Sequence, residues 1–65
     1  MLDNNKIRAL RTKRNMTLED LSRKSEVGYF TLQRIETGYT KDPGINNIAR
    51  IAKALQTKVD DLLIS

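Results

Sequence analysis

Residues 25–38 read SEVGYFTLQRIETG and place two of the three aromatic residues of this 65-residue chain, Tyr29 and Phe30, side by side. Apolar residues in this stretch recur at helical spacing and predict a helix over about 28–37, with Gly38 as its stop. Adjacent side chains on a helix point about 100° apart, so one buried stripe rarely takes both rings. We therefore expect at least one aromatic ring to face outward.

The residues just before this helix predict a second helix, joined to it by a very short turn. Thr17 followed by Asp20 matches a capping box at its start, and the helix is expected to end near Ser25. Only residues 26–28 then separate the two helices, so their axes must cross steeply. Such a tight connection is typical of a helix-turn-helix, which we place at about 17–37.

Elsewhere the apolar residues recur at three- and four-residue steps, and no alternating, strand-like run is present. Three further helices are predicted, over about 4–14, 45–55 and 59–64. The second of these carries a wide apolar stripe, made of Ile45, Ile48, Ala49, Ile51, Ala52 and Leu55. The chain is therefore predicted to be all-α, a compact five-helix bundle that forms one domain over residues 1–65.

The composition narrows the classes of function. The chain has no Cys and no His, so it lacks the usual soft metal ligands, a thiol nucleophile and the common proton shuttle. We expect a protein that is not an enzyme and has no metal site and no cofactor. Twelve Lys and Arg against eight Asp and Glu give a net charge of +4, which favours a polyanionic partner. The start, MLDNNKIRAL, holds no signal or membrane segment, so we expect a cytoplasmic protein without a membrane partner.

The stretch at residues 17–63, TLEDLSRKSEVGYFTLQRIETGYTKDPGINNIARIAKALQTKVDDLL, resembles the phage repressor and Cro type of helix-turn-helix domain, the XRE family. The resemblance covers about Asn5 to Leu63. Its most specific pieces are the capped helix start, RIETG, the Pro-Gly pair, IAKAL and VDDLL. It implies a lambda-repressor-like fold and a sequence-specific transcriptional regulator that binds double-stranded DNA. We expect a repressor, because the chain has no second domain to sense a ligand or to recruit an activator.

Three positions depart from the family pattern. Leu18 stands where the family usually has a phosphate-binding Gln, although the backbone N–H groups of that helix start can still bind a phosphate. Glu26 replaces a frequent turn glycine, so either it takes a left-handed conformation, at a cost of about 1 kcal/mol, or the turn is built differently. Ser25 is polar, whereas the other four positions that lock the helix pair together are apolar: Leu21, Val27, Leu32 and Ile35.

The resemblance places the base-reading residues on the second helix of the pair. They are Gly28, Tyr29, Phe30, Gln33 and Arg34. The last four share one face of the helix if Leu32 and Ile35 face the core. Arginine can then pair with guanine, glutamine with adenine, and the aromatic rings can contact thymine methyl groups.

Each of these side chains has a plainer alternative role. Phe30 could pack at the edge of the bundle, because the chain is short of large side chains. Gln33 could be a solvated surface residue, and Arg34 could form a surface ion pair with Glu26 or Glu36.

Phosphate contacts are expected from the far side of the base-reading helix and from the start of the helix that precedes it. The candidates are Thr17, Leu18, Thr37, Tyr39, Thr40, Lys41, Gly44 and Ile45. Lys41 is the best single candidate, and the others contribute hydroxyl groups or the backbone N–H groups of a helix start. Asn46 and Asn47 are equally well explained as contacts to the backbone of the nucleic acid and as polar residues of a helix start.

The resemblance also implies an ion pair between Arg11 and Glu36, which ties the first helix to the base-reading one. The alternative is that both are ordinary solvated charges. Removing one partner of a buried pair costs about 3–5 kcal/mol, whereas an exposed pair is worth less than about 1 kcal/mol.

A module of this size makes few base contacts, so we expect a homodimer on a two-fold symmetric operator with half-sites about 34 Å apart. Leu63 and Ile64 are the candidate dimer residues, because an exposed apolar end favours pairing. No small-molecule ligand is expected. The alternative function is a protein-interaction module, such as an antitoxin or anti-repressor, and both Leu18 and the aromatic pair favour it mildly.

Overall fold

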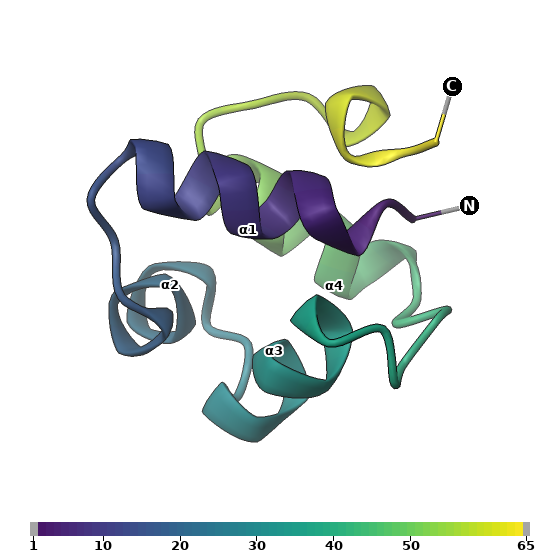
Figure 1. Ribbon diagram of the computed structural model, residues 1–65, viewed down its shortest axis with the longest axis horizontal. Helices are drawn as coiled ribbons and strands as arrows, with labels where there is room; N and C mark the ends of the chain where they lie inside the picture. Colours follow the sequence, from purple (N-terminus) through teal and green to yellow (C-terminus); the bar gives the residue numbers. More distant parts are fainter. Residues whose placement is uncertain (1, 65) are drawn as a thin grey trace.

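The computed structural model describes residues 2–64, which form four α-helices and one short 3-10 helix (Figure 1). The elements are α1 (Asn4–Lys13), α2 (Leu18–Ser25), α3 (Tyr29–Glu36), α4 (Ile45–Ala54) and the 3-10 helix η1 (Val59–Leu62). The all-α class is confirmed. In Figure 1, α1 crosses in front of α4, while η1 lies on one side of these two helices and α2 and α3 lie on the other.

The expectation of five helices is wrong, because the last predicted helix is a single 3-10 turn. Leu63 leaves this turn with an extended backbone (φ −97°, ψ 154°) and forms an isolated antiparallel bridge with Leu2. The Asp3 N–H also donates to the carbonyl oxygen of Leu62 at 2.8 Å. Pairing with the start of the chain therefore replaces a further helical turn at its end.

The helix starts are fixed by local side chains. Thr17 and Asp20 form both hydrogen bonds of the predicted capping box, from Asp20 N to Thr17 Oγ1 (3.1 Å) and from Thr17 N to Asp20 Oδ2 (2.9 Å). Bonds from the Thr17 backbone and hydroxyl lower the pKa of Asp20. The Asp3 carboxylate accepts from the N–H of Asn5 in the same way at the start of α1.

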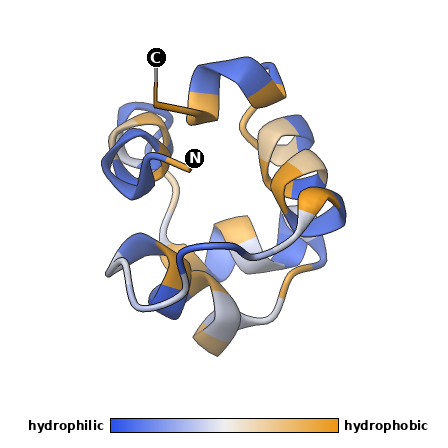
Figure 2. Ribbon diagram, turned by 90° about the vertical axis from the view of Figure 1, so that its right-hand side faces the viewer, coloured by the Kyte–Doolittle hydropathy of each residue, from blue (hydrophilic) through white to orange (hydrophobic). Residues whose placement is uncertain are grey.

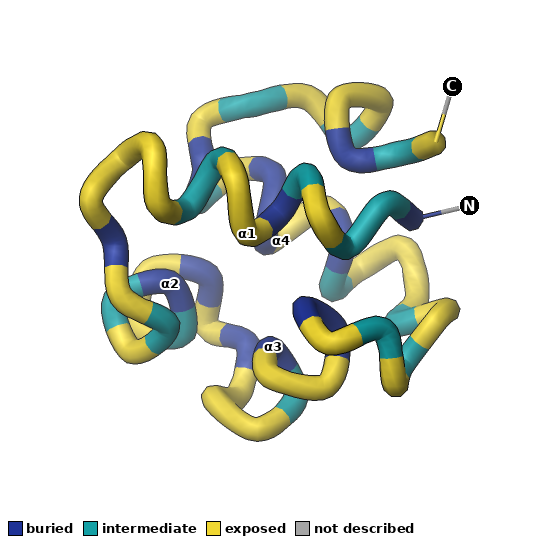
Figure 3. The backbone as a smooth tube through the Cα atoms, in the orientation of Figure 1, coloured by how far each residue is buried: buried dark blue, intermediate teal, exposed yellow. Residues whose placement is uncertain are grey.

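One apolar core joins all the elements (Figures 2 and 3). Its fully buried members are Ile7, Leu21, Leu32, Ile35, Ile51, Leu55 and Leu62. The stripe of α4 is narrower than predicted, because Ile45 is 66% exposed and Ala49 is also exposed. These two residues are four apart and form a row at the edge of the core row of Ile48, Ile51 and Ala52, on the side where the helix meets solvent.

Among residues 2–64, no helix has both the length and the apolar composition needed to cross a membrane.

The turn between α2 and α3 depends on a left-handed residue and two serines. Glu26 adopts φ 60° and ψ 26°, and its N–H donates to the carbonyl oxygen of Ser22. The predicted left-handed conformation of Glu26 is therefore confirmed. Ser22 Oγ donates to the carbonyl oxygen of Val27 at 2.7 Å, and the buried Ser25 Oγ accepts from the Val27 N–H at 3.2 Å. The polar residue at position 25 is therefore satisfied inside the helix pair.

We expect Glu26→Gly to raise the free energy of unfolding by up to about 1 kcal/mol, because glycine adopts a left-handed backbone without a Cβ penalty. Urea unfolding measures the change. The control is Lys24→Gly, which places glycine inside the last turn of α2 and should lower stability by about 0.5–1 kcal/mol. Equal destabilisation by both substitutions would contradict the assignment of strain to residue 26.

Candidate nucleic-acid interface

The outward face of α3 carries the side chains predicted to read bases. Leu32 and Ile35 are fully buried, whereas Phe30 is 69% exposed and Tyr29 is 40% exposed. Gln33 and Arg34 are also exposed, and Figure 3 shows exposed stretches of α3 alternating with its buried ones. The alternative in which Phe30 packs into the edge of the bundle is therefore wrong.

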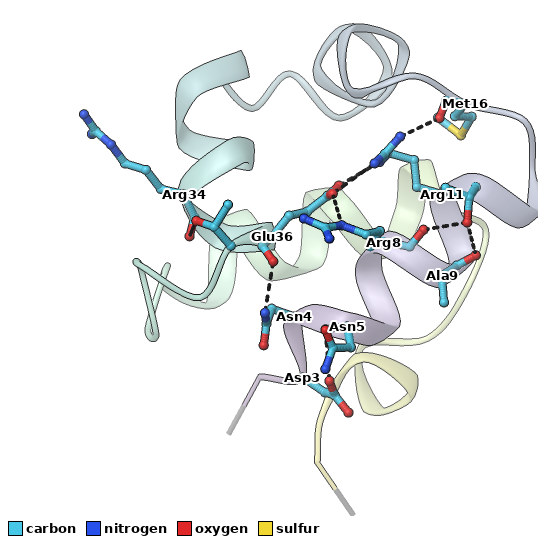
Figure 4. A network of polar contacts seen from close by, with 11 residues as sticks. Asp3, Asn4, Asn5, Arg8, Ala9, Arg11, Met16, Arg34 and Glu36 are labelled. Carbon is cyan, nitrogen blue, oxygen red and sulfur yellow. Dashed lines mark hydrogen bonds and ion pairs between the residues drawn. The ribbon is translucent and has the colours of Figure 1, made fainter.

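Arg34 extends away from the rest of the protein (Figure 4). Within residues 2–64 it forms no ion pair, because the three pairs present use Arg8, Arg11 and Arg23. Its predicted alternative partner Glu36 is fully engaged elsewhere. The guanidinium of Arg34 is thus available for a ligand.

The residues after α3 continue this exposed surface. Gln33, Arg34, Thr37 and Tyr39 line one shallow hollow. Tyr39 is 80% exposed and Lys41 is exposed without an ion pair in the described chain, whereas Thr40 is half-buried and its N–H donates to the Arg34 carbonyl oxygen. The loop at 37–44 therefore brings hydroxyl groups and one ammonium group beside the end of α3.

Two helix starts lie on either side of α3, that of α2 on one side and that of α4 on the other (Figure 1). Thr17 is exposed, whereas Leu18 is half-buried and packs against the core. Gly44 and Ile45 are exposed, and no side chain caps α4. The Asn47 amide donates to the Pro43 carbonyl oxygen at 3.0 Å, which favours its role in the helix start.

Behind this surface, the predicted ion pair between Arg11 and Glu36 is present as a bidentate contact (Figure 4). Arg11 Nε lies 2.7 Å from Glu36 Oε2, and Arg11 Nη2 lies 3.0 Å from Oε1. The Glu36 side chain is only 3% exposed and that of Arg11 is 15% exposed, so the alternative of two solvated charges is wrong. The hydrogen bonds to Glu36 raise the pKa of Arg11, and its Nη1 also donates to the Met16 carbonyl oxygen at 2.8 Å.

Sequence reasoning missed two further partners of Glu36. Arg8 Nε lies 3.3 Å from Glu36 Oε1, and the Asn4 amide donates to the Glu36 carbonyl oxygen at 2.9 Å. A signal was present, because Asn4, Arg8 and Arg11 occur at spacings of four and three, which place them on one face of α1. This polar row joins α1 to the end of α3.

The chain is similar to known proteins both in sequence pattern and in fold. A family model described as Helix-turn-helix matches residues 7–62. Among solved structures, the chain is similar to SinR, the master regulator for biofilm formation, in a crystal structure of its complex with DNA. The TM-score is 0.90, the identity is 24%, and the match covers 94% of this chain and 100% of that one. No curated protein sequence matches the chain significantly.

Proposed function

The chain belongs to the helix-turn-helix family, and we propose that it is a transcriptional regulator that binds double-stranded DNA in a sequence-specific manner. The observation that carries the proposal is the exposed face of α3 between the starts of α2 and α4. The likeness to SinR, whose structure was solved with DNA, supports the same function.

In this proposal α3 enters the major groove and its outward side chains meet the edges of the bases. Arg34 is extended and has no ion-pair partner in the part of the chain that the structure describes, so it can donate two hydrogen bonds to guanine O6 and N7. Gln33 lies on the same face. Its side-chain amide can donate a hydrogen bond to adenine N7 and accept one from the adenine N6 amino group. These two residues supply the polar part of sequence recognition.

The flanking groups hold the DNA backbone. The N–H groups at the starts of α2 and α4 suit phosphate binding, because each helix start carries unpaired donors and a partial positive charge. Lys41, Thr37 and Tyr39 add side-chain contacts from the loop beside α3. The Arg11–Glu36 pair lies behind this surface and holds α3 against α1.

We further propose that the protein is a cytoplasmic repressor that occupies its operator as a homodimer and has no catalytic activity. Half-sites about 34 Å apart would place two copies of α3 in successive major grooves. Ile64, which is 55% exposed, and the half-buried Leu63 are the candidate contacts between the two copies.

Selection of bound duplexes from a random pool tests the function directly. We expect one enriched, two-fold symmetric sequence whose log affinity falls linearly with log salt, because binding releases counterions from phosphates. A protein-interaction module is the second candidate, and the exposed Phe30 together with the core-packed Leu18 favours it. The absence of salt-sensitive binding to any duplex would favour that second candidate.

We expect Lys41→Ala to weaken binding about equally on all duplexes and to reduce the salt slope by about one unit, because it removes one phosphate contact. Fluorescence anisotropy over a salt series measures both quantities. Lys58→Ala is the matched control: this exposed lysine precedes η1, on the opposite side of the bundle from α3. If both variants change the slope equally, Lys41 has no specific phosphate contact.

A further inference from the structure

The first turn of α3 carries an exposed pair of aromatic rings. The ring centroids of Tyr29 and Phe30 lie 5.5 Å apart and their planes are perpendicular, which is the favoured edge-to-face arrangement. Phe30 is 69% exposed, whereas Tyr29 is 40% exposed. The more buried ring thus packs against the more exposed one and restricts its orientation at the surface.

The bundle itself does not need a phenylalanine at this position. The core residues of α3 are Leu32 and Ile35, which are fully buried, and Phe30 belongs to the opposite face. Leaving most of a large ring in water forgoes the free energy that its burial would supply. We therefore infer that the exposed ring of Phe30 serves to contact an apolar group of a ligand and does not serve the stability of the fold.

Gly28, the residue before the pair, is also not required by the fold. Its φ is −57°, which any residue can adopt, and an added Cβ would meet only Thr31 Oγ1 at an ordinary 3.5 Å. Ser, Asp or Asn would cap α3 as well as glycine or better. The fold therefore does not explain why position 28 carries no side chain.

Resting on the DNA-binding function proposed above, we propose that Phe30 forms a binding site for the C5-methyl group of a pyrimidine, with Tyr29 positioning its ring. The thymine methyl is the apolar group that base pairs present in the major groove, where Phe is a suitable contact. Gln33 and Arg34 are one helical turn further along the same face and read polar edges. 5-Methylcytosine carries the same methyl group at the same ring position, so the site accepts it as well.

The test uses the intact protein and its selected duplex, with each thymine replaced in turn by deoxyuridine. This replacement removes only the methyl group and keeps every base-pairing hydrogen bond. We expect wild-type affinity to fall about fourfold at one position in each half-site, which corresponds to about 0.8 kcal/mol for one buried carbon group. The Phe30→Ala variant should bind the duplex with thymine at that position and the duplex with deoxyuridine there with equal affinity. A cytosine there should be bound about fourfold more tightly when it is 5-methylated.

Three variants separate methyl recognition from general weakening. Gln33→Ala should lose affinity yet keep the thymine-to-uracil difference, because its side chain reads another base. Tyr29→Ala should reduce that difference, and Tyr29→Phe should restore it, since the second ring is retained. Thermal unfolding by circular dichroism checks that Phe30→Ala remains folded, as expected for a mostly exposed side chain.

The outcomes distinguish this proposal from the function on which it rests. If no duplex is bound in a salt-dependent manner, both proposals fail. If a selected duplex is bound but uracil has no effect at any thymine, only methyl recognition fails. An equal uracil effect in wild type and Phe30→Ala also overturns it, because another residue would then contact the methyl group.

Discussion

We expect Glu36→Ala to lower the free energy of unfolding by about 3–5 kcal/mol, because it leaves the guanidinium of Arg11 largely buried without its charged partner. Small domains are stable by only about 5–15 kcal/mol, so this loss is a large fraction of the total. Urea unfolding followed by circular dichroism measures the change. We expect the midpoint to fall far more than for any surface charge substitution.

The matched control is Arg23→Ala. Among residues 2–64, it removes the one ion pair whose two side chains are both accessible to solvent. The Arg23 and Asp20 side chains are 75% and 33% exposed, so the loss should stay below about 1 kcal/mol. A double substitution, Arg11→Met with Glu36→Leu, should recover much of the stability, because apolar replacement of a buried pair is often neutral. If Glu36→Ala and Arg23→Ala cost the same, the Arg11–Glu36 contact is not a buried pair in solution.

Arg34→Ala should lower affinity for the selected duplex by roughly 10- to 100-fold. The variant should lose its preference for the selected base at one base pair of each half-site and keep its preferences at the other base pairs. A bidentate contact to guanine provides about 1–3 kcal/mol of discrimination against other bases. Affinities are measured on duplexes in which each base pair is changed in turn. The variant should bind the wild-type site and the site altered at that guanine with similar affinity.

Arg34→Lys provides the control for charge alone. Lysine keeps the positive charge but lacks the planar fork that pairs with guanine O6 and N7, so specificity should fall while the salt slope stays nearly constant. Lys41→Ala gives the opposite result, with an unchanged base preference and a smaller slope. A uniform loss on all duplexes for Arg34→Ala would remove this residue from the base-reading role.

The helix-turn-helix was predictable because its signals are local. Thr17 and Asp20 are three residues apart and fix the start of α2 through their own hydrogen bonds. Gly38 has φ 84° and ends α3, as expected for a residue without a Cβ penalty. Helical spacing also placed Phe30 opposite Leu32 and Ile35, but its burial at the edge of the bundle remained an alternative that only the structure ruled out.

The sequence by itself therefore determined the class of fold, the helix pair and the side of α3 that Leu32 and Ile35 turn toward the core. Only the tertiary structure decided that the chain ends in a 3-10 turn bridged to Leu2, that α4 leaves Ile45 exposed, and that Arg8 and Asn4 join Glu36. The physical reason is the distance along the chain. Caps and helical faces depend on neighbours within about four residues, whereas the contacts of Glu36 with α1 join residues 25 to 32 positions apart.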